Sequence, residues 1–174
     1  MTSLVHLASR LYGTPLLIAR SKLDVILSVL GPRIGLPEIE AAIPLPAPKT
    51  SASAGQLGIA IIPVHGTLVR RAMGLEAASG LTSYGEIAAR LDAALADPQV
   101  SGILLDLDSP GGEAGGVFEL AERIRAANDI KPVWAHAGDS AFSAAYALAC
   151  ATQRVSLSAT GGVGSIGVIA LHID

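Results

Sequence analysis

The segment Ile103-Leu104-Leu105-Asp106-Leu107-Asp108-Ser109-Pro110-Gly111-Gly112 decides the fold of this chain. Its first half is a short apolar run typical of a buried strand, and Ser109-Pro110-Gly111-Gly112 is a turn that ends it. Val117, Leu120 and Ile124 then recur at helical spacing. A strand that leads through two glycines into a helix predicts an α/β domain with a largely parallel sheet.

Strands and helices alternate on both sides of this segment. Ser83 and Glu86 have the spacing of a capping box, so they predict the start of a helix that Asp97-Pro98 ends. Glycines separate the last two strands. The further elements expected from the pattern are strands at Ile59–Val64, Val133–His136, Arg154–Ser158 and Ile166–Leu171, and a short helix at Ser143–Cys150.

Two segments precede this domain. The apolar residues from Leu16 to Leu30 predict one amphipathic helix, which Gly31-Pro32 ends. Gly35 to Gly55 is rich in Pro, Ser and Ala, a composition typical of an extended linker. We therefore expect an N-terminal helical segment at 1–34, a linker at 35–57 and a catalytic domain at 58–174, incomplete at its C-terminus.

Composition narrows the class of protein. Apolar residues make up 51% of the 174 residues and charged residues only 16%. We therefore expect a homo-oligomer in which partner subunits cover part of the apolar surface. The net charge of -3 supplies no basic field for nucleic acid. Charged residues interrupt the apolar stretch 16–30 and the start lacks the pattern of a secretory signal. With Cys150 as a single cysteine, expected to lie in the core, we predict a cytoplasmic protein without a membrane segment.

Three small-residue segments carry the candidate chemistry. The N–H groups of Gly111 and Gly112 can point at a developing anion. Ser143 enters a helix of small residues, where its hydroxyl is either an N-cap or a nucleophile with the Ala144 N–H beside the oxyanion. The four glycines of Gly161 to Val168 bend a strand or form a loop, but no Lys-Ser/Thr follows as in a phosphate loop.

The order of these segments resembles peptidase family S49, which contains signal-peptide peptidase A and the phage head-maturation or minor capsid proteases. The likeness rests on Ser109-Pro110-Gly111-Gly112, on Phe142-Ser143-Ala144-Ala145-Tyr146 and on Gly164-Ser165-Ile166-Gly167-Val168. It covers residues 58–174 and includes Val64 to Leu68 and Asp129 to Trp134. The chain looks more like the phage branch, because it has no membrane anchor and begins with a helix and a Pro-rich linker.

The resemblance implies a Clp-protease/crotonase-like fold and a serine endopeptidase that needs no metal or cofactor. Ser143 would be the nucleophile, and Gly112 or Gly111 together with Ala144 would form the oxyanion hole. The implied substrates and partners are the scaffold, portal or coat proteins of a phage procapsid, which places the enzyme in the host cytoplasm or the procapsid.

The general base departs from the family pattern. In the family it is a lysine after the Gly-Ser-Ile-Gly-Val segment, and none of Lys22, Lys49 and Lys131 matches it. We expect a C-terminally truncated chain whose Ser-Lys dyad takes its base from beyond Asp174 and which is inactive as it stands. His136 and His172 are rival bases for a Ser-His pair.

Two other functions remain open from the sequence. A crotonase-type acyl-CoA enzyme would use carboxylates such as Glu113 and Glu119, and a non-catalytic capsid-assembly or scaffold-linked protein would need no base. Asp106 and Asp108 are expected to serve the strand end rather than acid–base chemistry. His6 and His65 have no companion at the spacing of zinc ligands.

Overall fold

The main sheet is parallel throughout and gives the molecule its frame. The computed structural model describes residues 15–18, 23–24, 26–27, 58–71 and 81–170. In this part of the chain the strands lie in the order β2 (Ile59–His65), β5 (Gly102–Ser109), β7 (Val133–Phe142) and β8 (Arg154–Leu157), and β9 (Gly162–Gly164) pairs with the end of β7. The predicted α/β class, with alternating strands and helices, is confirmed.

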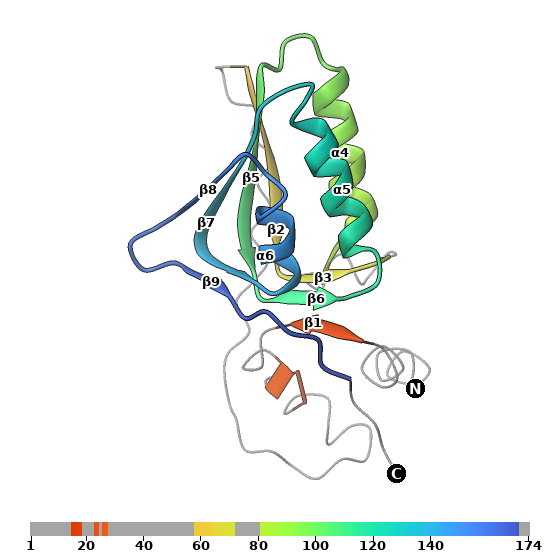
Figure 1. The fold of residues 1–174 in the computed structure, drawn as a ribbon, viewed down its shortest axis with the longest axis vertical. Helices are drawn as coiled ribbons and strands as arrows, with labels where there is room; N and C mark the ends of the chain where they lie inside the picture. The colour runs from red at the N-terminus through yellow and green to blue at the C-terminus, as the bar shows by residue number, and fades with distance from the viewer. Residues whose placement is uncertain (1–14, 19–22, 25, 28–57, 72–80, 171–174) are drawn as a thin grey trace.

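Helices cover one face of this sheet. Figure 1 shows α4 (Tyr84–Ala96) and α5 (Val117–Ala127) along that side, with the short α6 (Ala144–Ala149) packed below them. Burial along β5 alternates residue by residue, so that Leu105 and Leu107 are fully buried beneath the helices. The core is therefore a layer between the sheet and the helices.

The predicted start of α4 is confirmed in detail. The Ser83 hydroxyl accepts a hydrogen bond of 3.1 Å from the Glu86 amide, and Asp97 ends the helix. Ile87 and Leu91 lie buried on one face. Lys131 contacts the other end, where its ammonium donates to the carbonyl oxygens of Ala94 and Asp97 at 2.8 and 2.6 Å.

A second, smaller sheet crosses the carboxyl end of the main sheet. Its order is β1 (Leu16–Ile18), β6 (Gly111–Glu113), β3 (Thr67–Val69) and β4 (Leu81–Ser83), with β1 antiparallel to β6. Figure 1 shows β1, β6 and β3 lying across the lower end of β5. Ligands of parallel α/β sheets bind beyond the carboxyl ends of their strands, so this is the edge where a site is expected.

Several sequence predictions are wrong in their local structure. Leu16–Ile18 is a strand rather than the start of a helix, although Leu23, Asp24, Ile26 and Leu27 are helical as predicted. The strand predicted at Val133–His136 is longer than expected, because β7 continues to Phe142. The strand expected at 166–171 is reduced to one bridge residue, Ile169, and residue 171 lies outside the described part.

Two further expectations concern whole segments. Cys150 is an exposed free thiol at the end of α6 and not a core residue. The linker at 35–57 lies outside the described residues, and so does most of the segment 1–34, so the domain division stays a prediction. No helix in the described ranges is long and apolar enough to cross a membrane.

Candidate active site

Ser143 lies at the junction of β7 and α6 in a conformation that side chains rarely adopt. Its φ of 55° and ψ of -109° fall outside the regions open to most L-residues. Two backbone bonds hold it there: its amide donates to the Gly164 carbonyl at 2.7 Å, and its own carbonyl accepts from the Ala147 amide at 2.9 Å. Such strain costs about 1–3 kcal/mol and is typical of functional sites.

The hydroxyl of Ser143 is not used as a helix cap. No side-chain bond from Ser143 caps α6, so the N-cap alternative of the sequence is wrong. Among the described residues, the partner of this hydroxyl is the Gly167 carbonyl oxygen, 3.5 Å from Oγ, at the outer limit of a hydrogen bond. Ser143 is nonetheless 2% exposed, so its hydroxyl is buried, and within the described part of the chain this long contact is its one hydrogen bond.

Gly111 packs directly against Ser143. Its φ of +98° belongs to the region that favours glycine. A Cβ on Gly111 would lie 3.0 Å from the Cβ of Ser143 and 3.0 Å from the Phe142 carbonyl oxygen, and it would overlap the Leu17 carbonyl oxygen. Only glycine fits between the serine and β1 at this point.

The two glycines differ in what their amides do. The Gly111 amide donates 3.1 Å to the hydroxyl of Ser109, which itself donates 2.7 Å to the Gly66 carbonyl. Gly112 lies in β6 between Leu17 of β1 and Leu68 of β3. A Cβ on Gly112 would overlap the Leu68 carbonyl, so this glycine is required by the close approach of β3 whatever else it does.

Ala144 is the first residue of α6, and its amide therefore has no intrahelical acceptor. Ala144 and Ala145 are fully buried, so small side chains pack the base of the serine as the sequence predicted. The structure thus brings Ser143, Gly111 and Ala144 together, with Gly112 the next residue along β6.

The rival bases lie elsewhere or outside the described part. His136 Nδ1 lies 3.0 Å from the hydroxyl of Ser156, a residue of β8. Lys131 lies at the end of α4, and residues 22, 49 and 172 are outside the described ranges. Neither described candidate, His136 or Lys131, forms a hydrogen bond with the Ser143 hydroxyl.

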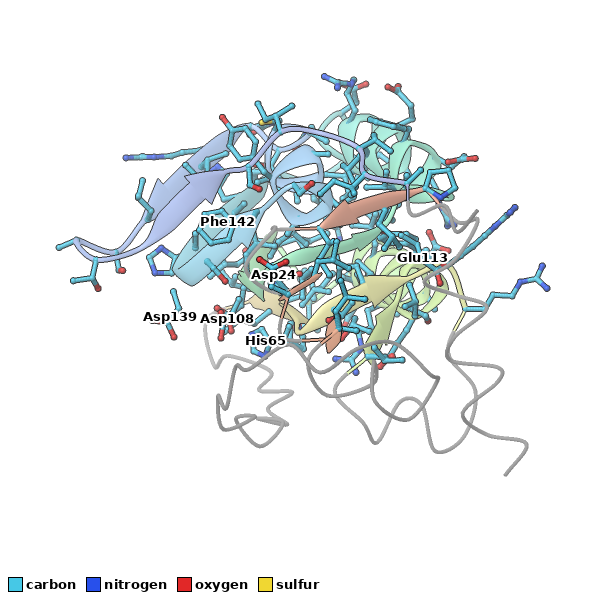
Figure 2. The ribbon with its side chains drawn as sticks, turned by 90° about the horizontal axis from the view of Figure 1, so that it is seen from below. Asp24, His65, Asp108, Glu113, Asp139 and Phe142 are labelled. Atoms are coloured by element: carbon cyan, nitrogen blue, oxygen red, sulfur yellow. The ribbon has the colours of Figure 1, made fainter. Side chains whose placement is uncertain are left out.

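The acidic residues form a separate polar group at the ends of β2, β5 and β7. His65 Nε2 lies 3.0 Å from an Asp106 carboxylate oxygen, and Asp108 accepts from the Ser140 hydroxyl at 3.1 Å. Figure 2 shows His65 beside Asp108, with Asp139 next to them and Glu113 on the far side. The sequence missed the His65–Asp106 pair. The register of β2 on β5 places His65 opposite Asp108, and Asp106 lies two residues earlier in β5, so the contact runs diagonally between the strands.

The carboxylates expected of an acyl-CoA enzyme do not form a pair. Glu113 accepts from the Arg70 amide at 2.8 Å, and its backbone carbonyl accepts from the hydroxyl of buried Tyr84 at 2.5 Å. Glu119 is exposed in the first turn of α5, where a negative charge favours the helix dipole. Burial, and secondarily the charge of Glu113, raises the pKa of Tyr84 well above its ordinary value.

Comparison with known proteins gives relatives along the whole chain. Residues 125–174 match the model of Peptidase family S49. The chain is 38% identical over 191 residues to capsid assembly protease C of Escherichia phage lambda, a match that covers 99% of this chain and 44% of that protein. It is 37% identical over 190 residues to head-tail preconnector protein GP5 of Enterobacteria phage P21, covering 99% and 38%. The chain thus spans less than half the length of these relatives.

Proposed function

Because this chain belongs to peptidase family S49, we propose that it carries the nucleophile of a serine endopeptidase that acts in phage capsid maturation. The Ser143 hydroxyl attacks the carbonyl carbon of a peptide bond while the base takes its proton. The C–N bond then breaks, and the amine fragment leaves with that proton. Water hydrolyses the remaining acyl-enzyme to a carboxylic acid and free Ser143. The observation that carries this proposal is the strained, buried Ser143, whose hydroxyl makes one long contact among the residues that the structure describes.

The oxyanion is held by backbone N–H groups in this proposal. Ala144 supplies one, as the first amide of α6. Gly112 is the better second donor, because the Gly111 amide already donates to the Ser109 hydroxyl. Donors of this kind stabilise the charge that develops in the transition state, and loss of one costs about 10²–10³ in rate.

The base in this proposal is the family's lysine, in line with a Ser-Lys dyad. Two observations support it over a base among the described residues. His136 is engaged with Ser156, and the Lys131 ammonium donates to two carbonyl oxygens at the end of α4. An amine base is active only when unprotonated, so the rate should fall as pH decreases.

The proposed substrates are scaffold, portal or coat proteins of a procapsid. This rests on the names of the relatives, a capsid assembly protease and a head-tail preconnector protein. The test is cleavage of co-expressed candidate capsid proteins by a chain that includes the family lysine, compared with the same chain carrying Ser143→Ala. Processing lost in the variant supports the proposal, and unchanged processing contradicts it.

We also propose that the enzyme is a homo-oligomer. Large apolar side chains are exposed around β8 and the segment after β9, including Leu157 at 50%, Ile166 at 84% and Val168 at 59%. β8 and β9 both pair with β7, and apolar side chains exposed on neighbouring segments are often covered by a partner. Sedimentation of the chain and of Leu157→Asp would test it, with a smaller species expected for the variant.

A further inference from the structure

Strand β1 is bound along both of its edges. On one edge it pairs antiparallel with β6, with Leu17 opposite Gly112 and Ile18 opposite Gly111. On the other edge, the Leu16 amide donates to the Ile169 carbonyl and the Ile169 amide donates to the Leu16 carbonyl, each at 2.8 Å. Both walls of this groove are main chain, which is how a protein accepts an extended peptide by strand addition.

This groove passes directly beside Ser143. A Cβ placed on Gly111 would contact both the Leu17 carbonyl oxygen and the Cβ of Ser143. The far wall is part of the same arrangement, because Gly164 accepts from the Ser143 amide and Gly167 lies 3.5 Å from its hydroxyl. A carbonyl group of the strand in the groove is therefore presented next to the serine.

The side chains of β1 are buried in apolar surroundings. Leu16, Leu17 and Ile18 are 5%, 7% and 3% exposed. Leu17 joins the main core together with the residues of α6, whereas Leu16 and Ile18 pack in a smaller cluster with Leu23 and partly buried Ile169. An occupant of this groove is therefore selected for apolar side chains at successive positions.

The antiparallel ladder adds a specific hydrogen-bonding role for Gly112. Pro15 is the residue before Leu16, and its carbonyl accepts a hydrogen bond of 3.0 Å from the Ala114 amide across the ladder. Hydrogen-bonded pairs alternate along an antiparallel ladder, so Leu17 and Gly112 form the next such pair in this register. The Gly112 amide thus faces a strand carbonyl beside Ser143, where the oxyanion of a cleaved peptide would lie.

We infer that Leu16–Ile18 occupy the substrate groove as a mimic built into the chain, and that the groove takes an extended peptide with consecutive apolar residues. In calling the groove a substrate site, this inference rests on the proposed function. About 40 residues separate Ile18 from Ile59, enough chain for β1 to leave without moving β2. An occupant that belongs to the same chain has an effective concentration on the order of 1 mM, so it competes strongly with a peptide in solution.

The test uses the full chain and a fluorescent peptide with the sequence of residues 14–19, Thr-Pro-Leu-Leu-Ile-Ala. Leu17→Asp places a carboxylate in an apolar pocket, so the built-in strand is released. We expect this variant to bind the peptide at least about tenfold more tightly than the wild type, measured by fluorescence anisotropy. A peptide with Asp at its second leucine should not bind.

Phe118→Asp is the control, because it also replaces a large apolar side chain by a carboxylate, but at an exposed site on α5. It should bind the peptide as weakly as the wild type. Equal binding by wild type and a folded Leu17→Asp chain, or equal binding of the Asp-containing peptide, would overturn the inference. Circular dichroism establishes that each variant is folded.

If Leu17→Asp does not fold, hydrogen exchange of the wild-type chain tests whether β1 is a releasable occupant of the groove. A built-in occupant opens locally, so the amides of Leu16–Ile18 should exchange faster than those of β5. Equal protection would mean that β1 is released only by global unfolding, which contradicts the inference. The peptide-binding measurement is repeated with Ser143→Ala, a variant that keeps the groove. It tests whether the groove binds the peptide independently of whether Ser143 is the nucleophile.

Discussion

Gly111 and Ser143 are so close that a Cβ on the glycine would lie 3.0 Å from the Cβ of the serine. Gly111 begins β6, two residues after the end of β5, and Ser143 directly follows β7; β5 and β7 pair in parallel. Parallel pairing places both residues at one edge of the sheet. This contact fixes the position of the serine from behind, while the Gly164 carbonyl holds its amide at 2.7 Å.

Gly111→Ala should therefore disturb both folding and activity. The methyl group would overlap the Leu17 carbonyl, and φ of +98° disfavours alanine. We expect a loss of about 1–3 kcal/mol in the free energy of unfolding and near loss of activity, measured by urea denaturation and peptide hydrolysis. Gly138→Ala in β7 is the control, because its Cβ would meet nothing within 4 Å. Equal stability of the two variants would contradict this account.

Ser109→Ala tests the support beneath the glycine turn. The buried Ser109 hydroxyl accepts from the Gly111 amide and donates to the Gly66 carbonyl, and alanine would leave both groups without this partner. Denaturation should report a loss of about 1–3 kcal/mol. Ser101→Ala removes an exposed hydroxyl that also bonds a carbonyl, that of Gly58, and should cost less than about 0.5 kcal/mol. A Ser109 variant as stable as the Ser101 variant would refute the role.

Tyr84→Phe tests the anchor of β6. The Tyr84 hydroxyl donates to the Glu113 carbonyl, and its loss should cost about 1 kcal/mol at neutral pH. Burial raises the pKa of Tyr84 in the folded protein above its value in the unfolded chain. The folded state therefore gains stability from the neutral phenol below about pH 10, and this gain is lost as the pH rises toward the pKa of the folded protein. Unfolding at pH 8 and pH 10.5 should show a shallower alkaline loss in the variant. Parallel curves for both proteins would count against this assignment.

The sequence predicted the elements whose signals are local. The capping box of Ser83, the apolar period of α5 and the apolar run of β5 each specify their structure within a few residues. The sequence predicts a helix at Leu16–Ile18, because its apolar residues continue into a helical pattern. Its strand conformation comes from β6 and Ile169, which are far away in the sequence.

The candidate site was predicted in its residues but not in its geometry. The small residues after Ser143 and the two glycines indicated nucleophile and oxyanion donors. The positive φ of Ser143 and the bond from Gly111 to Ser109 depend on how β7, β9 and β6 meet. The predicted strand ends at His136 because Gly138 and Asp139 are poor strand formers, yet pairing with β5 and β9 extends β7 to Phe142.

The central claim is that Ser143 is the nucleophile, and labelling by a fluorophosphonate probe tests it most directly. The chain used should include the family lysine, so that the hydroxyl has a base. Ser140→Ala is the matched control, since Ser140 lies three residues earlier and its hydroxyl donates to Asp108. We predict a single phosphonylated residue, Ser143, with labelling abolished by Ser143→Ala and retained in Ser140→Ala. Labelling that persists in Ser143→Ala would contradict the account.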